Sequence, residues 1–104
     1  VKYTIMFYDV LREGFIIMET TLIIENKTGL HARPASMFVQ EANKFSSKIK
    51  LTAKGKTVDA KSILMIMSLG LTQGTELTIS AEGDDAQAAL DALTGLIKNK
   101  FGEE

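Results

Sequence analysis

The chain has 104 residues, of which 45% are hydrophobic, with 12 basic and 13 acidic side chains and a net charge of −1. This length favours one domain with one core, and the near-neutral charge argues against binding of nucleic acid or an anionic membrane through an overall field. With no cysteine and one histidine, the chain can form no disulfide, thiolate zinc site, thiol nucleophile or histidine-rich metal site. We therefore expect no metal and no cofactor, and the lack of disulfides is compatible with the cytoplasm.

Residues 1–17 are largely apolar but carry charges at Lys2, Asp9, Arg12 and Glu13. These charges interrupt any run that approaches the ~20 apolar residues of a membrane helix, and the segment lacks the pattern of a signal peptide. Two interpretations stay open. The segment either derives from upstream of a natural start at Met18, or it forms a genuine extra strand or contact segment. We treat residues 1–17 as an N-terminal extension and residues 18–104 as the domain.

From residue 20 onward the pattern becomes regular. Residues 21–25 predict a strand and residues 26–29 a turn. Residues 35–45 have helical spacing, with apolar side chains recurring along one face. Residues 48–54 alternate between apolar and polar side chains, and residues 57–60 return after Gly55, which predicts a hairpin with one solvated face.

The second half of the chain continues with two helices around one strand. Ser62 suits the N-cap of a short helix that ends at Gly70. Residues 76–81 predict a strand, and a last helix follows Asp84 and Asp85, with Lys98 near its end, as the helix dipole favours. The order βαββαβα, with one apolar face on each element, predicts a two-layer α+β sandwich of four strands and three helices.

His31 lies where the predicted turn meets the first helix, within the motif TGLHARPAS of residues 28–36. We expect it at the N-cap or the adjacent position, because Pro34 is tolerated only in a first turn. The unpaired N–H groups of Ala32, Arg33 and Ala35 would then attract an anion, and the Arg33 guanidinium suits phosphate oxygens. A phosphoryl group transferred to the imidazole would be held there without a further covalent bond, so that it can leave again.

Other interpretations of the histidine compete with this one. A lone histidine at a helix start can simply cap the helix or lie idle on the surface. Nothing in the sequence resembles the nucleophile elbow of a hydrolase, and a metal site lacks a second soft ligand. The small Gly29 and Ala32 are expected to leave the approach to the ring open for another protein.

A nucleic-acid-binding domain is a further class to weigh. The lysines at residues 48, 50, 54 and 56 form a basic edge, but no aromatic residues interleave with them for base stacking. We interpret these lysines as solvent-facing charge that protects a strand.

Three motifs in order, GLHARPA, AKSILMIMSLG and LTQGTELTISAEG, resemble HPr, the histidine-containing phosphocarrier family of the bacterial sugar phosphotransferase system. The resemblance covers residues 20–98 and leaves residues 1–17 outside. It implies an open-faced β-sandwich, a four-stranded antiparallel sheet covered by three helices, with phosphorylation on Nδ1 of His31 and Arg33 as the phosphate-neutralising residue. The donor would be phosphorylated enzyme I, charged by phosphoenolpyruvate, and the acceptors IIA domains of sugar permeases. The chain would then be a cytoplasmic phosphoryl carrier, with no membrane insertion, rather than an enzyme.

Ser62 matches a serine that, in many relatives, an ATP-dependent HPr kinase/phosphorylase modifies, giving a form that binds a catabolite-control repressor. The five apolar residues that follow it exceed what one side of a helix can bury. We therefore expect an exposed docking patch near the histidine from Ile63, Leu64 and Met67. Burial of this helix by residues 1–17 is the alternative. A regulatory module acting through Ser62, or a nitrogen-branch phosphocarrier, also remains open.

Overall fold

The computed structural model describes the backbone of residues 4–8 and 15–103 and the side chains of residues 17–103. The described part contains five strands, three α-helices and a short 3₁₀ helix. In chain order they are β1 Thr4–Tyr8, β2 Phe15–Ile23, α1 Ala32–Ala42, β3 Lys48–Ala53, β4 Lys56–Asp59, α2 Ile63–Ser68, β5 Glu76–Glu82, α3 Ala86–Lys98 and η1 Lys100–Gly102.

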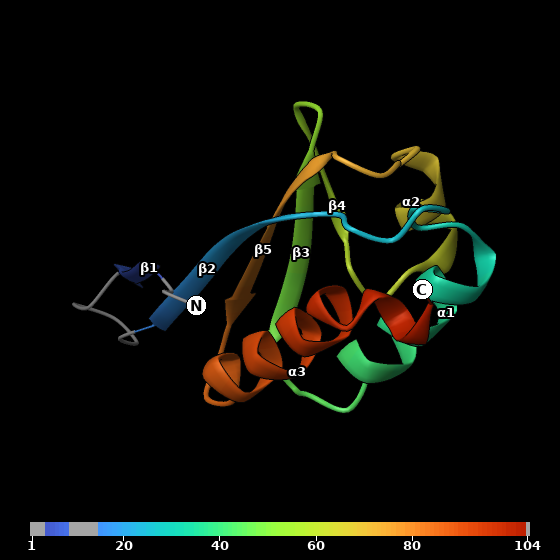
Figure 1. The fold of residues 1–104 in the computed structure, drawn as a ribbon. Helices are drawn as coiled ribbons and strands as arrows, with labels where there is room; N and C mark the ends of the chain where they lie inside the picture. The colour runs from blue at the N-terminus through green and yellow to red at the C-terminus, as the bar shows by residue number, and fades with distance from the viewer. Residues whose placement is uncertain (1–3, 9–14, 104) are drawn as a thin grey trace.

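The strands form one antiparallel sheet in the order β1-β2-β5-β3-β4. Helices α1 and α3 lie side by side against one face of this sheet, and the face turned away from them carries no helix among the described residues (Figure 1). Helix α2 packs against α1 and β4. The open-faced two-layer α+β sandwich expected from the sequence is confirmed.

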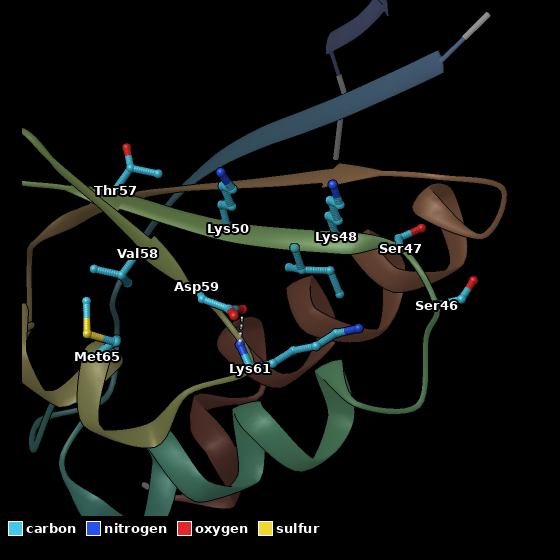
Figure 2. A pocket seen from close by; sticks show the side chains of 10 residues that line it. Ser46, Ser47, Lys48, Lys50, Thr57, Val58, Asp59, Lys61 and Met65 are labelled. Atoms are coloured by element: carbon cyan, nitrogen blue, oxygen red, sulfur yellow. Dashed lines mark hydrogen bonds between the residues drawn. The ribbon is translucent and has the colours of Figure 1, made fainter. Parts of the chain in front are cut away.

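Alternation along the strands separates the core from the open face. In β3 the side chains of Ile49, Leu51 and Ala53 are buried beneath the helices. Lys48 and Lys50 point to the opposite side of the strand (Figure 2). The helices supply the other half of the core, including the fully buried Phe38 of α1, and each such side chain contributes about 1.5–3 kcal/mol by leaving water.

The sheet has one strand more than the four predicted. Residues 4–8 form β1, which pairs with residues 15–19 of β2, so that β2 begins at Phe15 rather than at residue 21. The interpretation of the N-terminal extension as an extra strand agrees with this pairing, while residues 1–3 and 9–14 of that extension lie outside the described residues. The domain boundary between residues 17 and 18 stays a prediction.

Helix α1 begins three residues earlier than the prediction of 35–45 and ends at Ala42. It starts earlier because the carbonyl of His31 accepts the first helical hydrogen bond, from the N–H of Ala35, at 2.9 Å. Phe45 lies beyond the helix but packs against the core from the loop. Its apolar side chain extended the helical pattern past the true end of the helix.

Asp85 precedes α3 but does not cap it with its side chain. Its carboxylate accepts hydrogen bonds from the backbone N–H groups of Ser46, at 2.8 Å, and Ser47, at 3.0 Å, and from both hydroxyls. The hydrogen bond from the Ser47 hydroxyl is the largest cause that lowers the pKa of Asp85. Together with the other donors it outweighs the opposing effect of desolvation, so that the pKa is lowered to about 2. The predicted charge at the helix start therefore serves mainly to hold the loop between α1 and β3.

Candidate phosphoryl-acceptor site

His31 is the N-cap residue of α1, with an extended backbone at φ −82° and ψ −166°. Its side chain makes no capping hydrogen bond and is 46% exposed. The predicted position is therefore confirmed, and the interpretation of the imidazole as a side-chain cap is wrong. The ring is open to an approaching molecule.

The turn before His31 is held from two sides. The buried amide of Asn26 donates to the carbonyl of Gly29 at 2.7 Å, and the N–H of Leu30 donates to the carbonyl of Leu71 at 3.0 Å. Gly29 adopts φ +67° and is buried directly against the backbone of Leu71. The expectation that Gly29 opens the approach to the ring is wrong, because this residue faces the loop before β5; Ala32 is exposed, as expected.

Replacing Gly29 by alanine should therefore lower the free energy of unfolding. A Cβ at Gly29 would lie 2.3 Å from the carbonyl oxygen of Leu71, and the left-handed backbone adds strain of about 1–3 kcal/mol. Gly74→Ala is the matched control, since Gly74 has φ +88° but no heavy atom within 4 Å of the added Cβ. Urea unfolding should show the larger loss for Gly29→Ala, and equal losses would contradict the steric argument.

The start of α1 offers backbone donors beside the imidazole. The N–H groups of Ala32 and Arg33 have no hydrogen-bond partner among the described residues, as expected in a first turn. The N–H of Ala35 bonds to the carbonyl of His31, so the prediction that it is a free donor is wrong. Two free N–H groups, with the positive end of the helix dipole, are suited to an anion.

The Arg33 guanidinium is also beside His31, but it is already engaged. Its Nη2 donates to a carboxylate oxygen of Glu103 at 2.9 Å and to the carbonyl of Phe101 at 3.2 Å. Its Nη1 contacts the sulfur of Met37 at 3.2 Å. The side chain remains 54% exposed, so it is accessible to an incoming anion that competes with Glu103.

Glu103 is the anion of this site that the sequence analysis missed. One of its carboxylate oxygens accepts from the Thr28 hydroxyl at 2.6 Å and from the Asn26 amide at 3.2 Å. The other lies 3.4 Å from Nε2 of His31. The hydrogen bond from the Thr28 hydroxyl is the largest cause that lowers the pKa of Glu103. Together with Asn26 and Arg33 it outweighs desolvation, so that the pKa is lowered to about 2. The carboxylate is therefore ionised at neutral pH.

Asn26 and Thr28 were also missed as site residues, although both lie in the predicted turn. Thr28 is part of the motif that marked His31, so its nearness in sequence was an available signal. Glu103 lies 72 positions after His31, and no local pattern marks such a contact. The only hint was an apolar Phe101 followed by Gly102, which is compatible with a buried chain reversal.

The neighbouring carboxylate favours one imidazole nitrogen for bond formation. Glu103 lies 3.4 Å from Nε2, and an anion at this distance favours the tautomer whose proton is on Nε2. The lone pair of the neutral ring is then on Nδ1. An exposed nucleophilic nitrogen beside a guanidinium and two free N–H groups can accept and hold a phosphoryl group.

Helix α2 presents the predicted patch. Ser62 is its N-cap, and the hydroxyl accepts from the N–H of Met65 at 3.3 Å. Ile66 is the buried residue of the helix. Its four other apolar side chains are exposed: Ile63, Leu64, Met65 and Met67. Leu64 is 81% exposed, so the described side chains leave it open; the alternative in which residues 1–17 bury this helix falls largely outside the described residues. Met65 is an exposed neighbour that the prediction did not name.

The basic edge is solvent-facing but partly engaged. Lys54 donates to the carbonyl of Gly70 at 2.7 Å, and Lys48 lies opposite Glu82 of β5. A hollow of about 500 Å³ lies beside this edge (Figure 2) and contains none of the residues around His31. Its lining comprises Ser46, Ser47, Lys48, Ile49, Lys50, Thr57, Val58, Asp59, Lys61 and Met65. The interpretation of these lysines as surface charge agrees with their exposure.

Within the described residues, no three histidine, cysteine, aspartate or glutamate side chains gather in a group that could hold a metal ion. No helix in the same part of the chain is both long enough and apolar enough to span a membrane.

Comparison with known proteins identifies the family. Residues 18–99 match the family model described as "PTS HPr component phosphorylation site". The chain is 51% identical over 74 residues to the HPr-like protein Crh of Bacillus subtilis, covering 71% of this chain and 87% of that protein. It is 55% identical over 69 residues to the phosphocarrier protein HPr of Haemophilus influenzae, covering 66% and 81%.

The structural comparison identifies the same family. The crystal structure of HPr-C-His from Thermoanaerobacter tengcongensis superposes with a TM-score of 0.80 at 59% identity, covering 83% of this chain and 97% of that one. The chain belongs to the HPr phosphocarrier family, as the sequence motifs indicated.

Proposed function

We propose that this chain is a phosphocarrier of the phosphoenolpyruvate-dependent sugar phosphotransferase system. Nδ1 of His31 would accept a phosphoryl group from phosphorylated enzyme I and pass it to IIA domains of sugar permeases. The chain then acts as a carrier that returns to its starting state, rather than as an enzyme. Phosphoenolpyruvate is a cytoplasmic metabolite, so this relay operates in the cytoplasm.

The observation that carries this proposal is the exposed imidazole at the open end of α1. The ring is 46% exposed, and the N–H groups of Ala32 and Arg33 are free beside it. The charge on a phosphoryl group would be offset by these donors and by the Arg33 guanidinium. None of these groups bonds covalently to phosphorus, so the group remains transferable.

The test mixes the protein with enzyme I and labelled phosphoenolpyruvate. We expect label on the peptide that contains His31, stable in alkali and lost in acid, as an N–P bond requires. Subsequent addition of a IIA domain should remove the label from the chain. Absence of label, or acid-stable label only, would contradict the phosphocarrier proposal.

Regulation through Ser62 is a second function that the relatives favour, since they include HPr-like Crh proteins. Ser62 is partly exposed, and its oxygen already accepts from a helix N–H. A phosphate on this oxygen would keep such a partner, so modification is compatible with the helix. The modified form would bind a catabolite-control repressor. A purely regulatory copy needs no acceptor nitrogen, and the exposed His31 therefore favours a chain with both roles.

HPr kinase/phosphorylase with ATP provides the test of Ser62. Acid-stable label on the Ser62 peptide, absent from Ser62→Ala, is the result expected for the regulatory role. Unlabelled protein, under conditions in which a known HPr substrate is labelled, would contradict it.

Leu64 is proposed as a docking residue for enzyme I. Its side chain is 81% exposed on α2, beside the exposed Ile63 and Met67, and exposed apolar patches mark partner sites. Leu64→Asp should raise the KM for the carrier in transfer from enzyme I by about 10-fold or more, a typical penalty for a central interface side chain. Thermal unfolding should barely change. Ile23→Asp is the matched control, because Ile23 is 47% exposed on the open sheet face, and an equal KM increase in both variants would contradict docking at α2.

A further inference from the structure

The methionines of the chain differ in how far the protein protects their sulfur atoms. Met18 is buried in the core. Met37 is partly buried, and its sulfur is contacted by Nη1 of Arg33 at 3.2 Å. Met65 and Met67, both on α2, are 45% and 42% exposed. An oxidant in solution can therefore reach the two sulfur atoms of α2 more readily than those of Met18 and Met37.

The two exposed methionines lie on different sides of α2. Met67 follows Ile63 by four positions and Leu64 by three, so these three exposed side chains share one side of the helix and form the docking patch. Met65 instead lines the hollow beside the basic edge, together with Val58 of β4 (Figure 2). The helix thus carries one accessible sulfur inside the docking patch and one of similar exposure outside it.

Oxidation by a peroxide changes the polarity of a methionine side chain. The sulfur lone pair attacks one oxygen of hydrogen peroxide, so that an S–O bond forms while the O–O bond breaks. The proton on the transferred oxygen passes to the displaced hydroxide, which leaves as water. Sulfur loses two electrons, the peroxide gains them, and the product is the polar methionine sulfoxide. The chain contains no cysteine, so it has no thiol that reacts first.

The position of the sulfoxide decides its effect on docking. At Met67 the new oxygen would lie within an apolar contact, where it loses water without gaining a hydrogen-bond donor. Burial of an unpaired polar group costs free energy, so the contact is weakened. At Met65 the oxygen would face the solvated hollow, outside the patch, and would keep its water.

We propose that Met67 is an oxidation site through which peroxides reversibly weaken the docking of this carrier to enzyme I. Met18 and Met37 are protected, and oxidation of Met65 does not affect docking. Methionine sulfoxide reductases convert the sulfoxide back to the thioether, which would restore the patch. This inference rests on the phosphocarrier function and on the docking at α2 proposed above.

The experiment compares Met65→Leu, which keeps the sulfur in the patch, with Met67→Leu, which keeps the sulfur outside it. Each variant is treated with hydrogen peroxide until peptide mass spectrometry shows full conversion of its remaining methionine on α2. The KM for the carrier in transfer from enzyme I is then compared with that of the same variant before treatment. Met6, whose side chain lies outside the described residues, is present in both variants and contributes equally.

Oxidised Met65→Leu should show a KM about 5-fold or more above its untreated form, the factor that corresponds to burying one unpaired polar group. Oxidised Met67→Leu should keep its untreated KM. Methionine sulfoxide reductases should return the KM of oxidised Met65→Leu to its starting value. Peptide mapping of the unsubstituted chain should show Met65 and Met67 converted before Met18 and Met37, with the urea midpoint unchanged at that stage.

The outcomes separate the proposals. If the untreated chain takes up no acid-labile label, the phosphocarrier function itself is contradicted. If label is transferred but peroxide raises the KM equally in both variants, or in neither, the role of Met67 is overturned while the phosphocarrier function stands. Conversion of Met18 or Met37 ahead of Met67 also overturns it.

Discussion

The His31→Ala variant is expected to fold like the parent chain and to accept no phosphoryl group from enzyme I. The chain contains no other imidazole, so no second phosphohistidine can form. Folding should be preserved because the ring is exposed and makes no capping hydrogen bond. Surface substitutions of this kind change the free energy of unfolding by about 0.5 kcal/mol or less.

Two measurements check this expectation. Label transfer from phosphoenolpyruvate should fall to the background of a reaction without carrier, while the urea midpoint stays near that of the parent chain. Ser62→Ala is the control, because it keeps the imidazole and should keep the acid-labile label. Acid-labile label retained by His31→Ala would mean that a different residue is the acceptor.

The position of His31 could be predicted from the sequence because its determinants are local. Pro34 requires a first turn, and Gly29 requires a tight turn before it, so the helix must begin between them. The same reasoning located the free N–H groups of Ala32 and Arg33. This reasoning was wrong for Ala35, because its N–H donates the first helical hydrogen bond, to the carbonyl of His31.

Periodicity was less reliable at element boundaries. Phe45 packs against the core from a loop, and its spacing from the apolar residues of α1 imitated one more helical turn. Residues 15–17 were assigned to an extension, yet they continue β2 and pair with β1. In both cases an apolar side chain or an extended backbone is stabilised by neighbours that are distant in sequence, and a local pattern contains no information about them.

Glu103 shows the same limit at the site itself. Its partners Asn26, Thr28 and Arg33 lie 77, 75 and 70 residues earlier in the chain. The sequence around Glu103 does not indicate which distant residues its carboxylate contacts. The buried position of Phe101 and the left-handed backbone of residues 100–102 bring the carboxylate to the imidazole.

Replacing Phe101 by alanine is expected to lower the free energy of unfolding by about 3–5 kcal/mol. The ring is fully buried in the core beneath α3, and its removal leaves a cavity as well as losing apolar burial. The backbone strain at φ +55° is common to both residues, so packing alone accounts for the change. Urea unfolding measures the loss. Leu96→Ala is the control, since Leu96 is only partly buried near the end of α3 and should cost less.

A loss of stability below about 1 kcal/mol in Phe101→Ala would contradict the buried position of the ring, because removal of a fully buried aromatic side chain costs more than that. Equal losses in Phe101→Ala and Leu96→Ala would contradict it as well, since Leu96 is only partly buried.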